Sequence, residues 1–114
     1  MTEKNHLYVL WTNDNFITAE KMVFMYTTNA MLHGWWEKVS VIIWGATAQL
    51  WAENDEIKEL ISKAQEAGVF FTACKACADQ LGVTQSLEKL DIEVIYWGDP
   101  LTRILKADEK LISI

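Results

Sequence analysis

Proline and cysteine are scarce in this sequence, which has one proline and two cysteines among 114 residues. Two cysteines cannot build the dense disulfide framework on which many small secreted domains depend. The chain is instead 51% hydrophobic, which is enough to form an apolar core without cross-links. Its length is typical of one folding unit, so we expect residues 1–114 to form a single domain.

Positive charge is also in short supply. Ten Lys and Arg residues stand against 16 Asp and Glu residues, which gives a formal net charge of −6. Nucleic-acid binding depends on clustered Lys and Arg side chains that neutralise phosphates. Here the basic residues are scattered among acidic ones, so we expect no nucleic-acid partner.

Long hydrophobic runs are missing as well. The longest apolar runs, such as residues 39–44, have the length of a strand and are far too short to span a bilayer. Residues 1–5 are polar and are not followed by the apolar segment of a secretory signal. We therefore expect no membrane association and a cytoplasmic protein, whose thiols are kept reduced.

Short apolar runs alternate with helical patterns along the chain. Connections of helix length between strands predict parallel neighbours and right-handed crossovers. The pattern therefore predicts a three-layer, doubly wound α/β fold, with a mainly parallel five-stranded sheet and helices on both faces. The predicted strands are residues 6–11, 39–44, 69–74, 93–97 and 110–114; the predicted helices are residues 16–33, 53–67, 75–81, 84–90 and a last one beginning at Asp99-Pro100, with a loop at 45–51.

The predicted helix at residues 16–33 is apolar almost all round. A helix that lies on a small sheet buries only one face in its own domain. The remaining apolar surface predicts contact with another subunit, so we expect a homo-oligomer.

In a sheet of this kind, ligands bind beyond the carboxyl ends of the strands. The polar turn after the first predicted strand offers backbone groups for a small anion, or alternatively only a helix cap. Trp44, Trp51 and Trp97 fall near the same edge, as pocket walls or as core residues. The candidate ligand-binding residues at this edge are Thr12, Asn13, Trp44, Gly45 and Thr47.

The segment Cys74-Lys75-Ala76-Cys77 lies at a predicted strand-to-helix junction. Free N–H groups at the start of a helix stabilise a thiolate, and Lys75 adds a cation nearby. Three interpretations remain open: two buried and inert thiols, a thioredoxin-like dithiol, or sulfur carriage with Cys74 as acceptor and Cys77 as a resolving or assisting thiol. The candidate catalytic residues are therefore Cys74, Cys77 and Lys75.

Cofactor and metal motifs are not found. Neither G-x-G-x-x-G nor G-x-x-x-x-G-K-[ST] occurs, so we expect no bound nucleotide cofactor. Of the residues that could ligate zinc, only the two cysteines have suitable spacing. We therefore expect no metal, and structural roles for His6 and His33.

Several segments together resemble the DsrE/DsrF-like sulfur-relay family, in particular a small single-domain subgroup with Cys-x-x-Cys after the third strand. The resemblance covers nearly the whole chain, and the Ala-Cys-Lys-Ala-Cys stretch is its most specific part. Two positions depart from the subgroup, because Ala46 stands where proline is common and Asp91 where glycine is common. At Asp91 we expect a left-handed backbone conformation, which Asp tolerates moderately. The similar segments are Trp44-Gly45-Ala46-Thr47-Ala48-Gln49-Leu50, Glu66-Ala67-Gly68-Val69, Ala73-Cys74-Lys75-Ala76-Cys77-Ala78-Asp79, Leu90-Asp91-Ile92-Glu93-Val94 and Gly98-Asp99-Pro100-Leu101-Thr102.

The resemblance implies a small α/β domain that assembles into dimers, trimers or hexamers. It also implies that Cys74 carries sulfane sulfur as a persulfide between donor and acceptor proteins, in tRNA thiolation or dissimilatory sulfur oxidation. Cys77 corresponds to an extra cysteine of the subgroup. The activity implied is that of a sulfur carrier, sulfurtransferase-like at most. The alternative is a non-catalytic oligomeric module that binds a small ligand or a protein; a dithiol redox protein is the third candidate.

Overall fold

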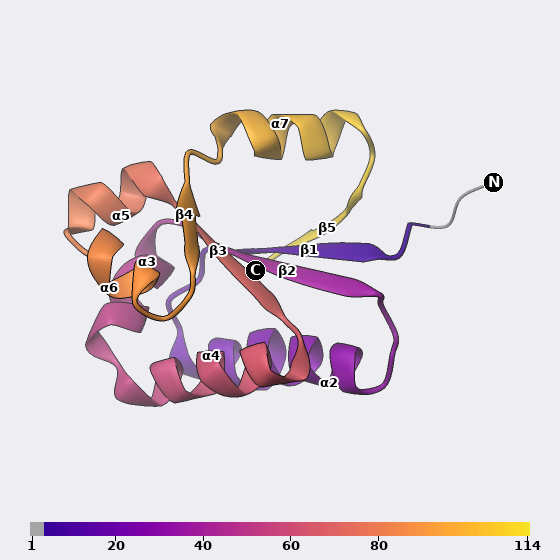
Figure 1. Cartoon of the computed structure of the whole chain (residues 1–114), viewed down its shortest axis with the longest axis horizontal. Coiled ribbons are helices and arrows are strands. Elements are labelled where there is room, and N and C mark those ends of the chain that lie inside the picture. The colour runs from indigo at the N-terminus through magenta and orange to yellow at the C-terminus, as the bar shows by residue number, and fades with distance from the viewer. Residues whose placement is uncertain (1–3) are drawn as a thin grey trace.

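A five-stranded sheet lies between two layers of helices in the computed structural model, which describes residues 4–114 (Figure 1). All strands are parallel, and their order across the sheet is β4-β3-β2-β1-β5. The predicted three-layer α/β fold is confirmed. The strands are β1 (His6–Trp11), β2 (Lys38–Ile43), β3 (Phe70–Cys74), β4 (Glu93–Ile95) and β5 (Lys110–Ser113).

The helices are divided unevenly between the two faces of the sheet. Figure 1 shows α2 and α4 covering one face and α7 lying alone over the other, while α3, α5 and α6 gather at one end of the sheet. The helices in chain order are α1 (Phe16–Thr18), η1 (Ala19–Phe24), α2 (Met25–Leu32), α3 (Ala46–Glu53), α4 (Asp55–Ala67), α5 (Lys75–Leu81), α6 (Thr84–Glu88) and α7 (Gly98–Lys106).

The two faces of the sheet carry cores of different size. Side chains alternate between faces along each strand, so one set of positions points to α2 and α4 and the other to α7. The first set includes Val9, Val41 and Phe71 and forms the larger core. The second forms a smaller cluster of buried residues, namely Ile42, Cys74, Trp97 and Ile104.

Two helical predictions need correction. Residues 45–51 were expected to form a loop, but α3 begins at Ala46 and runs to Glu53. Ala46, Ala48 and Gln49 favour a helix, and these preferences prevail over the break at Gly45. The helix expected at residues 16–33 is also not uniform, because its middle section η1 is wound as a π-helix.

Single residues account for where β4 ends and where α7 begins. Trp97 has helical backbone angles and caps α7, so β4 ends at Ile95 and is shorter than predicted. Pro100 lies in the first turn of α7, where its missing N–H group costs no hydrogen bond. Asp91 adopts the expected left-handed conformation, with φ of 59°.

The turn after β2 joins the ends of two strands. Gly45 has φ of 70° and ψ of −130°, a conformation that only glycine adopts without strain. The turn brings the fully buried Thr47 beneath β1, where its hydroxyl donates a hydrogen bond to the Trp11 carbonyl at 2.8 Å. The same hydroxyl accepts a bond from the Trp44 N–H at 3.3 Å, so one side chain ties together the carboxyl ends of β1 and β2.

Replacing Thr47 by Val should lower the free energy of unfolding by about 0.5–1.5 kcal/mol, because the hydroxyl bond to the Trp11 carbonyl is lost while the Trp44 N–H still donates to that carbonyl. Urea denaturation measures this change. Thr102→Val is the matched control, since the Thr102 hydroxyl also bonds to a carbonyl, that of Gly98, but is exposed; its cost should stay within about 0.5 kcal/mol. Equal losses for the two variants would contradict the strand-joining role of Thr47.

Candidate functional site

The site is built where β3 passes directly into α5. Cys74 is the last residue of β3 and the N-cap of α5, with extended backbone angles. Its side chain is only 5% exposed and lies on the α7 side of the sheet, in the cluster that contains Ile42, Trp97 and Ile104. The strand end therefore holds this thiol in an apolar enclosure.

Cys77 lies one helical turn further on and is half-buried. Burial raises the pKa of the Cys77 thiol above its ordinary value of 9.0, and a hydrogen bond to the Cys74 sulfur raises it further. A hydrogen bond from the backbone N–H of Gly45 acts in the opposite direction on this pKa. The two thiols are not joined in a disulfide, and Cys77 packs against the cluster that contains Cys74. Because its pKa is raised, Cys77 is largely protonated at neutral pH.

Lys75 was expected to supply positive charge to the thiols. Its ammonium forms an ion pair with Asp79 at 3.0 Å and lies 5.8 Å from the centre of the Tyr96 ring. The hydrogen bond to Asp79 raises the pKa of Lys75, while bonds from Thr84 and Lys75 lower that of Asp79. The charge of Lys75 is thus balanced on the surface of α5.

A pocket of about 210 Å³ opens beside Cys77. It lies between the start of α3 and the outer side of α5, and Cys77 is in its wall whereas Cys74 is not. Its walls carry two side-chain amides and no charged group. The lining residues are Gly45, Ala46, Gln49, Cys77, Gln80 and Leu81.

Among these pocket residues, only Gly45 and Cys77 are candidate site residues from the sequence. Gln80 and Leu81 follow Cys77 by three and four positions, a spacing that places them on the same helix face. That signal was available in the sequence. Ala46 and Gln49 gave no comparable signal, because they had been assigned to a loop rather than to α3.

The structure does not bring the predicted anion loop to the cysteines. Thr12 and Asn13 follow β1, which is separated from β3 by β2. Their backbone N–H groups both donate to the main-chain oxygen of Ile114, at 2.7 and 3.1 Å. The backbone donors that were candidates for anion binding therefore serve the pairing of β1 with the end of β5, while Asn15 caps α1.

The tryptophans near this end of the sheet are mainly core residues. Trp44 is half-buried and packs against the cluster that contains Cys74. Trp97 is buried and its indole N–H donates to the Thr72 hydroxyl at 2.8 Å. Trp51 is buried in the larger core. Of the predicted ligand-binding residues, Gly45 alone lines the pocket beside the thiols, and Thr47 supports its turn from below.

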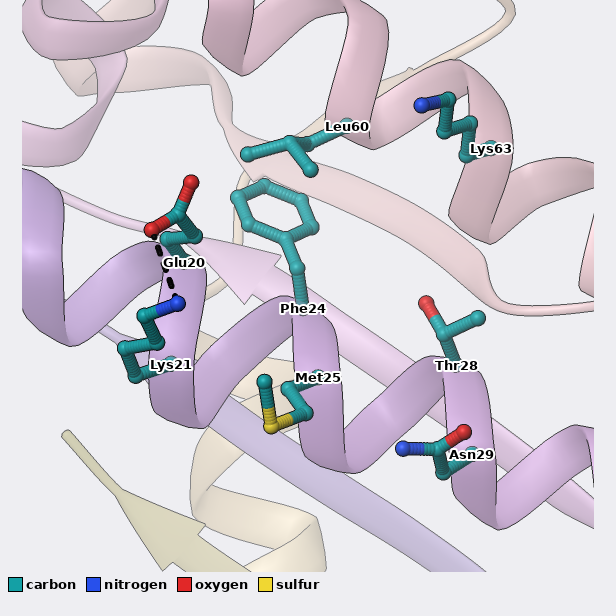
Figure 2. Close-up of a pocket in the computed structure, with 8 residues that line it drawn as sticks. All are labelled: Glu20, Lys21, Phe24, Met25, Thr28, Asn29, Leu60 and Lys63. Atoms are coloured by element: carbon teal, nitrogen blue, oxygen red, sulfur yellow. Dashed lines mark ion pairs between the residues drawn. The ribbon is translucent and has the colours of Figure 1, made fainter.

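A second concavity of about 310 Å³ lies between the first helical segment and α4 (Figure 2). We call it the α2–α4 groove. Figure 2 shows Phe24 and Leu60 pointing toward each other across it, with the Glu20–Lys21 ion pair, 3.4 Å long, at one end. Lys63 of α4 adds a further positive charge. This groove is separate from the cysteine pocket.

The histidines take part in local packing. His6 Nε2 and the Ser40 hydroxyl are 2.8 Å apart, and the His33 ring stacks on Trp35 with 5.1 Å between ring centres. Among residues 4–114, no group of three or more His, Cys, Asp or Glu side chains is arranged to hold a metal ion. No helix in this part of the chain is long and apolar enough to cross a membrane.

Comparison with known proteins identifies structural relatives. No model of a known protein family matches the chain, and no curated protein matches it significantly. The solved structure of MTH1491 from Methanobacterium thermoautotrophicum, a protein of unknown function, is 17% identical, with a TM-score of 0.70 over 96% of this chain and 98% of that one. This likeness shows the fold alone.

A closer likeness is to BT1422 from Bacteroides thetaiotaomicron, described as a conserved protein of unknown function. The two chains are 37% identical and superpose with a TM-score of 0.94. The alignment covers 96% of this chain and 95% of BT1422. The protein therefore belongs to the same family as BT1422.

Proposed function

We propose that the protein is a sulfur carrier that holds sulfane sulfur as a persulfide on Cys74 and passes it to a partner protein. The observation that carries this proposal is the pair of contacting thiols at the β3–α5 junction, one enclosed and the other in the wall of a pocket. The resemblance to the DsrE/DsrF-like sulfur-relay family supports the same chemistry.

The loading reaction needs only a thiolate and a hydropersulfide donor. The thiolate attacks the terminal sulfur of R–S–SH, the donor S–S bond breaks, and the donor leaves as a thiol after taking up a proton. The cysteine then carries the –S–SH group. The step needs no separate oxidant, because the cysteine is oxidised to the persulfide level as the donor is reduced to a thiol, and the cysteine thiol is restored when the sulfur passes on.

The surroundings of Cys74 suit storage of such a group. Rates of thiol exchange depend on access to the sulfur, so an enclosed persulfide is protected from thiols in solution. The enclosure is apolar and formed by residues of the sheet and α7, including Trp97 and Ile104. Delivery to a partner then requires docking near α5, where Leu81 and Tyr96 are large exposed apolar side chains.

Incubation with cysteine hydropersulfide should add one sulfur atom to the wild-type protein, on Cys74. Cys74→Ser should lose this stored sulfur, since a hydroxyl cannot form a persulfide. Site-resolved mass spectrometry after trapping with an alkylating reagent measures the modification, and Thr102→Ser is a control that leaves both thiols intact. A wild-type protein that takes up no sulfur from an active donor would rule out the proposed function.

The alkylation rate of Cys77 should increase with pH across the neutral range, by about tenfold per pH unit. The reason is that the pKa of this thiol lies above 9.0, so the reactive thiolate is a minor species at pH 7 and its share grows as protons are removed. Timed alkylation followed by peptide mass spectrometry gives the rate for each cysteine separately. A Cys77 rate that levels off below pH 8 would contradict this prediction.

A second candidate function is that of an oligomeric binding module, and the α2–α4 groove is the observation that favours it. Its floor is apolar, and its edges carry both a carboxylate and two ammonium groups. Met25 in its lining is exposed, and so are Met22 and Leu32 of the same helical segment. Since a two-fold contact places the same patch on both subunits, such a patch needs both signs of charge to be self-complementary.

We therefore propose that a second copy of the chain covers this groove. In a symmetric contact the exposed Met25 of one subunit would meet the apolar floor formed by Phe24 and Leu60 in the other. The lysines and Glu20 at the edges would pair between subunits. The apolar character of residues 16–33, which predicted an oligomer from sequence, is consistent with this arrangement.

Sedimentation velocity should give a mass above the 13.1 kDa of one chain. Met25→Glu should weaken association at least about tenfold, because it buries a carboxylate against the apolar floor of the partner's groove. Leu105→Glu is the matched control, since Leu105 is similarly exposed but lies on α7. A monomer mass at every concentration would exclude the contact, and equal weakening by both variants would exclude this groove as its location.

A further inference from the structure

Access from solvent distinguishes the two thiols. Cys74 is 5% exposed, is packed under Trp97 and Ile104, and takes no part in the wall of the pocket. Cys77 is half-buried and forms part of that wall. A donor must bring its terminal sulfur close to the attacking thiolate, in line with the bond that breaks. Within the described residues, the pocket offers such an approach to Cys77.

The pocket also indicates the class of donor. Its volume of about 210 Å³ suits a small molecule, and its polar walls are the side-chain amides of Gln49 and Gln80. No lining residue is charged, and the nearby ammonium of Lys75 is paired with Asp79. The walls thus provide no counter-charge for an inorganic dianion such as thiosulfate, whereas a hydropersulfide can enter in its protonated –S–SH form, in which its outer sulfur is uncharged and open to attack.

The Gly45 backbone supplies the one hydrogen bond that favours negative charge on Cys77. The left-handed φ of 70° at this glycine sets the direction of the chain as it leaves β2 toward α3. Gly45 and Cys77 both line the pocket, and the Gly45 backbone acts to lower the pKa of the Cys77 thiol. The same bond stabilises this sulfur when it attacks as a thiolate and when it leaves as one.

We propose that Cys77 is the first sulfur acceptor, taking sulfane sulfur from a small hydropersulfide in the pocket and handing it to Cys74. This inference rests on the proposed function, and it adds a route and a division of roles. Cys77 then touches the reacting atoms, so it is a catalytic residue rather than an assisting thiol.

Two displacements describe the route with atoms and electrons balanced. In the first, the Cys77 thiolate attacks the terminal sulfur of R–S–SH, the donor S–S bond breaks, and the donor departs as R–SH with a proton from solvent. In the second, the Cys74 thiolate attacks the outer sulfur of the Cys77 persulfide. The Cys77 S–S bond breaks, Cys77 leaves as a thiolate, and it regains the proton that Cys74 released.

The contact between the thiols makes the second step a short transfer. Cys77 packs against the cluster that contains Cys74, so the outer sulfur has only a short way to pass between the two thiols. If Cys74 attacked the inner sulfur instead, the products would be a Cys74–Cys77 disulfide and hydrogen sulfide. These products differ in mass and in sulfide release, so the two routes can be told apart.

The test follows sulfur on each cysteine with time, using cysteine hydropersulfide as donor and rapid trapping for mass spectrometry. Cys74→Ser should accumulate the added sulfur on Cys77, because the second acceptor is missing. Cys77→Ser should load Cys74 at least about tenfold more slowly than wild type. Thiosulfate in place of the hydropersulfide should load neither thiol of any variant.

A pocket-filling pair of variants tests the route without altering either thiol. Gln80→Trp adds bulk to the pocket wall and should slow loading of Cys74 at least about tenfold, whereas Gln85→Trp, on the exposed side of α6, should leave it unchanged. Circular dichroism and melting curves establish that each variant is folded.

Three results would overturn the inference. Loading of Cys74 at the wild-type rate in both Cys77→Ser and Gln80→Trp would remove Cys77 and its pocket from the route while leaving the proposed function intact. Release of sulfide together with formation of a Cys74–Cys77 disulfide would mean that Cys74 attacks the inner sulfur, so the proposed second step would be wrong. No sulfur on either thiol of the wild-type protein would instead defeat the proposed function itself.

Discussion

The backbone conformation of Gly45 is the constraint on which the site depends. A residue with φ of 70° and ψ of −130° reverses the chain direction within one position, and a side chain there would be strained. Because the chain turns at this point, Thr47 reaches the carbonyl of Trp11 and joins the ends of β1 and β2. The same turn presents an N–H group to Cys77 and forms one wall of its pocket. Gly45 therefore affects both the alignment of β1 with β2 and the surroundings of the Cys77 thiol.

The sequence was sufficient to predict the architecture, because parallel strands buried on both faces read as continuous apolar runs separated by helical patterns. The β3–α5 junction was predicted to the residue, and Asp91 was correctly assigned a left-handed conformation. Helix α3 was missed because Gly45 reads locally as the start of a loop. The π-helical section of residues 19–24 has no recognisable local signal.

The candidate site could be predicted in its chemistry but not in its geometry. Spacing placed the two cysteines together, yet only three-dimensional packing makes Cys74 the enclosed thiol and Cys77 the accessible one. The pairing of Lys75 with Asp79 was overlooked although the sequence indicates it, because residues four positions apart lie on the same face of a helix. Thr12 and Asn13 were grouped with the cysteines by the shared edge of the sheet, but β2 lies between their strands.

The uneven division of helices between the faces has a consequence for the lifetime of anything held on Cys74. On that side of the sheet Cys74 shares a cluster with Trp97 and with Ile104, which is the one buried residue among the nine of α7. Detaching a single short helix costs less free energy than unfolding the whole domain. The rate at which α7 lifts from the sheet therefore sets an upper limit on how long a group on Cys74 stays isolated. The packing of Ile104 against the sheet therefore affects how long the Cys74 side chain stays enclosed.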